Sequence, residues 1–157
     1  MANPHFYRQT LTWIGAKQGP AESYLTYSRD FEAEYDGKPS IQGSADPSYR
    51  GDASRLNPED LLVTAVASCH LLTYLALCTR NKYIVISYSD TPEGTMQMQD
   101  GKMSITDIVL RPKVVLAPGA DIEKARKLHE EAHDQCFITN SVRCDVSIVP
   151  EIVIEEH

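Results

Sequence analysis

Residues 57–80 read NPEDLLVTAVASCHLLTYLALCTR, and this segment decides much of the fold. Asn57 is a good helix cap, Pro58 suits the first helical position, and the two acids that follow face the positive end of the helix dipole. Apolar residues then occur on nearly every side of the helix, which is typical of a helix buried at the centre of a domain. We expect this helix to run to about Arg80 and to stop at Asn81.

The segments before this helix have the pattern of β-strands. Residues 5–15 alternate enough to predict a strand, and its inward side chains are expected to be Tyr7, Leu11 and Trp13. Residues 24–35 contain enough β-forming residues for one or two further strands. Residues 38–57 are rich in Gly, Ser, Asp and Pro, which predicts a long loop of the kind that is often functional.

Three further β segments and one amphipathic helix follow the central helix. They are, in order, strands over 84–98 and 103–117, a helix over 121–135 and a strand over 142–154. Asp100-Gly101 is a typical hairpin turn between the first two, and Pro150 interrupts the last. Because the strands come in runs, we expect one α+β domain over residues 1–157, with mainly antiparallel sheets.

Composition narrows the class of protein. The 157 residues carry a formal net charge of −7 and are 42% hydrophobic, which suits a globular domain and not a disordered chain. A net acidic chain with no basic block is a poor ligand for nucleic acids or anionic membranes. The apolar stretch 61–78 contains too many polar residues for a confident membrane span. The N-terminus has no signal-peptide pattern, so we expect a cytoplasmic protein whose cysteines are not structural disulfides.

Four cysteines are the first candidates for chemistry. Cys69 lies inside the apolar helix, where a free cysteine is most often a small hydrophobic side chain. Cys78 lies nine residues further on, on the opposite helix face, and we interpret it and Cys144 as structural. Cys136 ends the second helix, where a thiol is more often accessible. His133 shares its helix face and could lower the pKa of the thiol, hold a metal with it, or be solvated.

Four motifs occur together at defined spacings. They are Asn57-Pro58-Glu59-Asp60-Leu61-Leu62, Ser68-Cys69, Cys136, and Thr139-Asn140-Ser141. Glu59 is ten residues before Cys69, and Cys136 is 67 residues after it. These motifs, and the expected order of strands and helices over essentially the whole chain, resemble the OsmC/Ohr family of thiol-dependent peroxidases.

The resemblance implies an OsmC-like fold, with antiparallel sheets around a buried helix, and an intertwined homodimer. It also implies reduction of organic hydroperoxides to alcohols. Cys69 would be the attacking thiolate that becomes a sulfenic acid, and Cys136 would condense with it to a disulfide. A dithiol reductant, often of the lipoyl type in the family, would reset the pair, and no metal or flavin would be needed.

An arginine also belongs to the site that the resemblance implies. A neutral apolar helix centre would raise the pKa of Cys69, so its ionisation needs a nearby cation. In the family this cation is an arginine held by the glutamate of the Pro-Glu pair, which is Glu59 here. Arg50 is nine residues before Glu59, one fewer than expected for the family, and is the preferred candidate over Arg55.

The spacing of Glu59 and Cys69 has a geometric consequence. On one unbroken helix they would be about 15 Å apart, too far for Glu59 to orient an arginine at Cys69 of its own chain. Either the helix breaks after its first turn, or Glu59 and the loop arginine serve the cysteine of a second chain. The second option agrees with the homodimer that the resemblance implies, and a helix that is apolar on nearly every side favours it too.

His70 departs from the family pattern, in which an apolar residue follows the first cysteine. With Cys69, His133 and Cys136 it offers two His and two Cys, the right number and type for tetrahedral zinc. Their spacing is not a standard zinc signature, and adjacent helical residues point about 100° apart. We therefore expect His70 to contact the thiol site or to be a hydrogen-bonded core residue. The alternative function is a non-enzymatic OsmC-like stress or metal-binding module.

Overall fold

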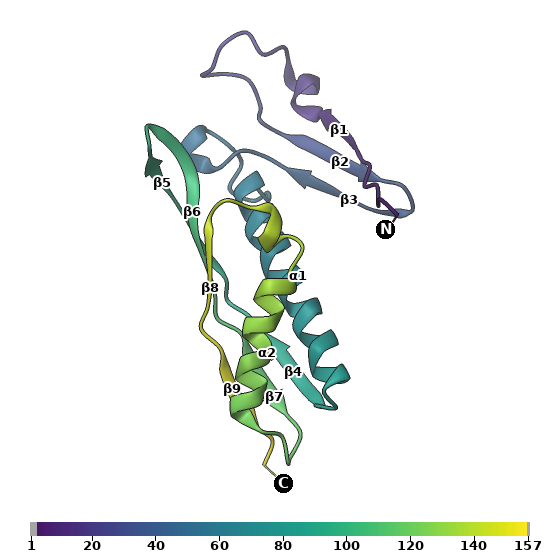
Figure 1. Ribbon diagram of the computed structural model, residues 1–157. Coiled ribbons are helices and arrows are strands. Elements are labelled where there is room, and N and C mark those ends of the chain that lie inside the picture. The colour runs from purple at the N-terminus through teal and green to yellow at the C-terminus, as the bar shows by residue number, and fades with distance from the viewer. Residues whose placement is uncertain (1–2, 157) are drawn as a thin grey trace. The chain divides into compact units, whose positions relative to one another are not determined.

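The computed structural model describes residues 3–156. The chain divides into two compact units, Met1–Leu61 and Leu62–His157, and Figure 1 shows the elements of each. The boundary falls in the first turn of α1 (Pro58–Arg80). Arg50, Arg55 and Glu59 therefore belong to the first unit, and all four cysteines belong to the second.

The first unit is built on a three-stranded antiparallel sheet in the order β1-β2-β3. The strands are β1 (Thr10–Trp13), β2 (Phe31–Tyr35) and β3 (Lys38–Gly43), with short 3₁₀ helices η1 (Ile14–Gln18) and η2 (Pro47–Tyr49). The expectation that Tyr7, Leu11 and Trp13 point inward is wrong, because all three are exposed. β1 is an edge strand whose four residues are all exposed, so alternation here marks a strand but not a covered face.

α1 is capped at both ends by its own sequence. The N–H of Asp60 donates to Asn57 Oδ1 (2.8 Å) and the N–H of Asn57 donates to the Asp60 carboxylate (3.1 Å), a reciprocal capping box. At the other end Lys82 has left-handed backbone, with φ 63°. The N–H groups of Lys82 and Tyr83 donate to carbonyls of the last turn, which makes a Schellman motif. The expected helix is confirmed, and it is unbroken.

The second unit holds the rest of α1, the helix α2 (Ile122–Gln135) and two three-stranded sheets, β4-β7-β9 and β5-β6-β8. The strands are β4 (Val85–Ser89), β5 (Glu93–Gln99), β6 (Lys102–Leu110), β7 (Lys113–Leu116), β8 (Asp145–Ile148) and β9 (Glu151–Ile154). Asp100 and Gly101 both have positive φ (50° and 76°) between β5 and β6, which confirms the expected hairpin.

Each of the three strands expected in this unit is divided in two, and the two halves join different sheets. A proline lies in every break, namely Pro92, Pro112 and Pro150. Proline lacks the N–H that a continuous ladder needs, so each long segment changes sheets there. Only the interruption at Pro150 was expected.

Four of the six strand pairs among the described residues are antiparallel, which agrees with the expectation of mainly antiparallel sheets, and the two sheets of the second unit are mixed. β8 pairs with β6 and β9 pairs with β7 in parallel, whereas β4 with β7 and β5 with β6 are antiparallel. The chain passes through α2 between β7 and β8, and a helical crossover of this kind returns a strand in the parallel direction.

The core of the second unit lies between α1, α2 and the sheets. One cluster joins Tyr74 and Leu77 of α1 to Leu128 of α2 and to residues of β7 and β9, and a smaller one surrounds Val66. The buried residues of α1 form one stripe, so the expectation of a helix buried on nearly every side does not hold within this chain. Leu72, on the other side, keeps 64% of its surface exposed.

α1 is also long and apolar enough to cross a membrane by length and composition alone. The core helix of a globular domain passes the same test, and one such helix is weak evidence. The buried stripe of α1 packs on α2 and the sheets.

Candidate active site

Cys69 and Cys136 come together although they are far apart in the sequence. Cys69 lies in the middle of α1, and Cys136 is the C-cap residue of α2. The two helices run side by side (Figure 1). Both cysteines are free thiols, and the Cys136 side chain hydrogen-bonds to the Cys69 sulfur. The two cysteines, 67 residues apart in the sequence, are therefore neighbours in the structure.

The surroundings of Cys69 lower the pKa of its thiol. Burial opposes its ionisation, but hydrogen bonds outweigh burial and lower its pKa. The backbone N–H of Ile138, the Cys136 thiol and the backbone N–H of Phe137 contribute to this lowering of the pKa, whereas the Thr73 hydroxyl donates to the carbonyl oxygen of Cys69 at 2.8 Å. Hydrogen bonds to the charged form are one of the ways in which a protein lowers a pKa. Cys69 is partly exposed, so a thiolate there can meet a substrate.

Cys136 is the less acidic thiol of the pair. It is fully buried, and burial raises the pKa of its thiol. The backbone N–H of Thr139 donates to its sulfur at 3.4 Å. The expectation that Cys136 would be accessible is wrong, because the chain after α2 turns through η3 (Thr139–Ser141) and covers it. The opposite pKa shifts make Cys69 the more acidic thiol of the pair.

A cavity of about 740 Å³ opens beside Cys69. Most of its lining is apolar and includes Leu72, Ala76 and Phe137, and Ser68, Thr73 and Arg80 contribute polar groups. Four of the α1 residues in this lining follow Cys69 at three, four, seven and eleven positions, which is one face of a helix. The cavity can take an apolar molecule that reaches the sulfur. Arg80 was not among the residues expected at the site, although its spacing of eleven residues from Cys69 marks the same helix face.

His70 does not contact the thiols and is a core residue. It is 1% exposed, and its Nε2 lies 3.0 Å from Nδ1 of His129, which is equally buried. The Tyr74 ring stacks on His129 with centroids 3.7 Å apart. Burial lowers the pKa of His70 to about 4 and that of His129 to about 3, so both rings are neutral near pH 7. His129 was not among the expected residues, although it lies one helical turn before His133.

We predict that this histidine pair makes the protein sensitive to mild acid. Both rings have a lower pKa in the folded chain than the 6.5 of a free histidine, so the unfolded chain binds more protons between about pH 4 and 6.5. The free energy of unfolding is therefore fully present above pH 6.5 and falls below it, by up to about 1.4 kcal/mol per pH unit for each ring. Urea unfolding at pH 7 and pH 5 measures this. The double variant His70→Phe/His129→Phe should lose most of the difference, and an unchanged difference would contradict the prediction.

The four residues considered for zinc do not form a metal site. Among residues 3–156, no group of three or more His, Cys, Asp or Glu side chains could hold a metal ion. His70 points to His129, away from the sulfur pair. The His133 Nδ1 is buried without a hydrogen-bond partner. The residues present therefore do not fit tetrahedral zinc.

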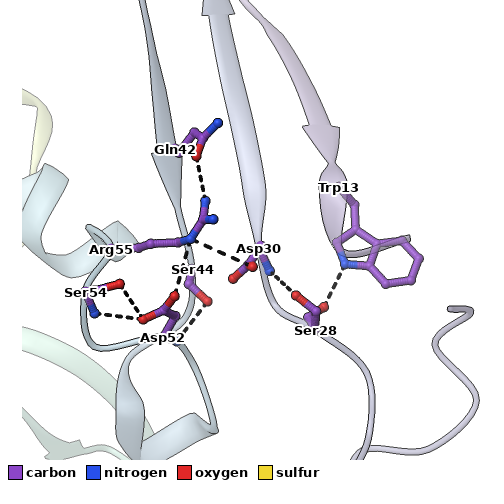
Figure 2. Close-up of polar contacts among 8 residues, drawn as sticks. All are labelled: Trp13, Ser28, Asp30, Gln42, Ser44, Asp52, Ser54 and Arg55. Atoms are coloured by element: carbon purple, nitrogen blue, oxygen red, sulfur yellow. Dashed lines mark hydrogen bonds and ion pairs between the residues drawn. The ribbon is translucent and has the colours of Figure 1, made fainter. Parts of the chain in front are cut away.

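The two candidate arginines lie in the first unit and differ in their surroundings. Figure 2 shows that Arg55 is held by Asp30, Asp52 and Gln42, at 3.8, 3.4 and 2.9 Å. Arg50 is exposed and donates to the Leu25 carbonyl at 3.3 Å. Arg55 is thus occupied by structural partners, whereas the Arg50 guanidinium has most of its donors free.

The loop that carries Arg50 is tightly built. Arg50 itself has left-handed backbone (φ 66°), and Asp46 caps η2 by accepting from the N–H of Ser48. A side chain on Gly51 would collide with the carbonyl oxygen of Ala45. The loop therefore presents Arg50 in a defined way.

Glu59 lies in the first turn of α1. Because α1 is unbroken, the alternative in which the helix breaks after its first turn is excluded. Glu59 and Cys69 are separated by ten residues of continuous helix, or about 15 Å along its axis. Glu59 is therefore too far along the helix to orient an arginine at Cys69 of its own chain.

The remaining cysteines lie away from the pair. Cys78 is buried in the cluster around Tyr74, and burial raises the pKa of its thiol. Cys144 packs against the cluster around Val66, and burial raises the pKa of its thiol as well. Both fit the structural role expected for them.

Two neighbouring thiols with opposite pKa shifts, next to an apolar cavity in an α+β unit, make a candidate two-cysteine thiol site. The sequence profile of the family described as OsmC-like protein matches residues 51–151. Because this match covers more than half of the chain, the chain belongs to the OsmC-like family. The resemblance seen in the sequence and the α+β OsmC-like fold are thereby confirmed.

Individual relatives agree with this assignment. The chain is 27% identical over 161 residues to the uncharacterized protein YmaD of Bacillus subtilis, covering 99% of this chain and 97% of that one. The structure of an OsmC-like protein of unknown function from Vibrio cholerae matches with a TM-score of 0.82 and 33% identity, over 94% and 100% of the two chains. The organic hydroperoxide resistance protein OhrB of Bacillus subtilis matches with a TM-score of 0.63 and 18% identity, over 94% and 98%. At 18% identity, this last similarity concerns the fold alone.

Proposed function

We propose that this protein reduces organic hydroperoxides to alcohols with Cys69 and Cys136 as its redox pair. The observation that carries the proposal is the hydrogen-bonded thiol pair, in which Cys69 has a lowered pKa and Cys136 a raised one. A thiolate nucleophile beside a protonated thiol is what a two-cysteine peroxidase needs. Solved structures of similar fold include proteins named for organic hydroperoxide resistance.

The chemistry balances with these two groups and a reductant. The Cys69 thiolate attacks the distal peroxide oxygen, the O–O bond breaks, and the alkoxide takes up a proton to leave as the alcohol. Cys69 is then a sulfenic acid. The Cys136 sulfur attacks it, forming the disulfide and releasing water. A dithiol of the lipoyl type returns both thiols by exchange. The apolar lining of the cavity beside Cys69 favours bulky organic peroxides over hydrogen peroxide.

A thiol titration tests the proposal directly. The protein is assayed for free thiols before and after one equivalent of cumene hydroperoxide, and for metal by elemental analysis. We expect the loss of two thiols per chain, with appearance of the alcohol. Unchanged thiols, or zinc in stoichiometric amount in the purified protein, would contradict the proposal and favour the non-enzymatic metal-binding alternative.

The complete site requires a second copy of the chain in this proposal. Glu59 cannot reach Cys69 along one unbroken helix, so Glu59 and Arg50 would serve the cysteine of a partner. The exposed apolar side chains Leu72 and Phe137, which keep 64% and 81% of their surface, support cover by a partner. Arg50 has free donors for this role, and Arg55 does not.

We predict a homodimer in solution on this ground. Light scattering at micromolar concentration should give about twice the mass of the 17.5 kDa chain. Leu72→Glu places a charge on the exposed apolar side of α1 and should shift the protein toward the monomer. Thr79→Glu, an exposed position at the end of the same helix, is the control and should stay dimeric. A monomeric native protein at all concentrations would exclude the model with a shared site.

A further inference from the structure

Two histidines of α2 lie one helical turn apart and line a second cavity of this unit. Residues 129–133 read His-Glu-Glu-Ala-His, and residues four apart share one face of a helix. The cavity has a volume of about 370 Å³ and shares no lining residue with the cavity beside Cys69. It is lined by Arg126, His129, Glu130 and His133 of α2, and by Val146, Ile148 and Pro150.

Each of the two rings has a buried nitrogen without a hydrogen-bond partner among the described residues. These atoms are Nε2 of His129 and Nδ1 of His133. The His129 residue is only 2% exposed, and its other nitrogen, Nδ1, lies 3.0 Å from Nε2 of His70. The ring edge that carries Nε2 of His129 therefore points away from His70, toward the cavity that His129 lines. Buried polar atoms of folded proteins nearly always have a partner, so two such atoms at one cavity indicate a bound group.

The chemistry of this cavity suits a transition-metal cation. Neutral imidazole nitrogens are common ligands of Zn²⁺, Cu²⁺ and Ni²⁺. An N–H of His129 Nδ1 that donates to His70 fixes the tautomer and leaves the Nε2 lone pair free for a metal. The Glu130 carboxylate lines the same cavity and adds negative charge beside a cation. The charge of Arg126 is offset by Glu123, whose carboxylate lies 3.9 Å from the Arg126 Nε.

We propose that His129 and His133 bind a divalent transition-metal cation such as Zn²⁺, through Nε2 of His129 and Nδ1 of His133. His70 acts as the positioning residue for the His129 ring. Among residues 3–156, no group of three or more His, Cys, Asp or Glu side chains could hold a metal ion. The protein therefore supplies two ligands, and water completes the coordination of the metal.

The spacing of these histidines is one that zinc proteins use. In the pattern His-Glu-x-x-His, two histidines on one face of a helix bind zinc in metalloproteases. A catalytic zinc site has three protein ligands, and no third ligand joins His129 and His133 within residues 3–156. The structure thus supports a site for metal binding and not a peptidase centre.

This site is separate from the thiol pair and does not depend on the proposed function. Two protein ligands hold a metal less tightly than the four of a structural zinc site. Protein purified with a chelator should therefore be free of metal and should take up Zn²⁺ that is added back. Zinc that stays with the chain through purification would belong to another site.

Equilibrium dialysis of the reduced, chelator-treated protein against Zn²⁺ tests the proposal. In His133→Ala we expect binding to weaken by at least about tenfold, because even the loss of an outer partner of a metal ligand typically costs that much. His5→Ala removes an exposed histidine outside α2 and is the matched control, which should bind as native protein does. Cys69→Ser/Cys136→Ser should also keep the site, since neither thiol lines this cavity.

A measurement on the native chain covers the case in which His133→Ala does not fold. Imidazole ¹H–¹⁵N spectra of the chelator-treated protein should show the His129 proton on Nδ1. Added Zn²⁺ should shift the ring resonances of His129 and His133 and leave those of His5 unchanged.

Any of four results would overturn the proposal. Absence of binding up to about 1 mM Zn²⁺ would leave the two ring nitrogens to water. Undiminished binding in His133→Ala would place the metal elsewhere, and binding lost in Cys69→Ser/Cys136→Ser would assign it to the thiols. A His129 ring with its proton on Nε2 has no lone pair there for a metal.

Discussion

Cys69→Ser is expected to reduce hydroperoxide consumption to the background rate. A serine hydroxyl stays protonated at neutral pH, and the hydrogen bonds that lower the pKa of the Cys69 thiol are far too weak to ionise it. The variant should fold normally, because the hydroxyl can accept the same N–H donors and the site is partly exposed. The measurement is loss of cumene hydroperoxide in the presence of a dithiol reductant.

Two other cysteines provide the matched controls for this variant. Cys144→Ser should keep full turnover, because Cys144 packs against another cluster. Cys78→Ala, in the buried core, should also turn over, although with lower stability, because it leaves a small cavity. Retained turnover in Cys69→Ser, or lost turnover in Cys144→Ser, would remove Cys69 from the centre of the mechanism.

The two helices of this chain could be predicted from the sequence because their signals are local. The Asn57 cap and the Asp121 cap lie within three residues of the N–H groups that they accept from. The pairing of β8 with β6 and of β9 with β7 is not local. It depends on the crossover through α2, and nothing in the pattern of residues 142–154 distinguishes parallel from antiparallel pairing.

The cysteine pair could be predicted, but only part of its environment could. Spacing and resemblance identified Cys69 and Cys136. The donors that lower the pKa of Cys69 include backbone N–H groups of Phe137 and Ile138, and every residue except proline has such a group, so no residue type marks them. The unexpected burial of Cys136 has the same origin, because it depends on how the chain turns through η3.

The histidines show that proximity in the sequence does not identify the contacts of a side chain. His70 looked unusual because it follows Cys69, and proximity in sequence suggested a role at the thiol. Its ring instead lies on the buried stripe of α1, facing His129 of α2. A helix turns adjacent residues about 100° apart, so the residue next to a nucleophile is a poor guess for its partner. The informative signal was the spacing of Val66, His70 and Tyr74, four residues apart on the core face.

Cys136→Ser is expected to separate the two halves of the reaction. The attacking thiol is intact, and a serine hydroxyl can still donate to the Cys69 sulfur, so the variant should react once with peroxide at close to the native rate. It should then stall, because no thiol stands beside the Cys69 sulfenic acid to form the disulfide. Steady turnover should fall to the background rate while the first reaction persists.

Intact mass after a peroxide pulse reads the outcome directly. Native protein should lose about 2 mass units as the disulfide forms, and Cys136→Ser should gain about 16 or, with excess peroxide, about 32. The variant Cys78→Ser/Cys144→Ser keeps both members of the pair and should behave as native. A disulfide needs Cα atoms within about 7 Å, which is consistent with the hydrogen bond that already joins the two thiols. If Cys136→Ser also loses about 2 mass units, another cysteine resolves the sulfenic acid, and the pairing proposed from the structure is wrong.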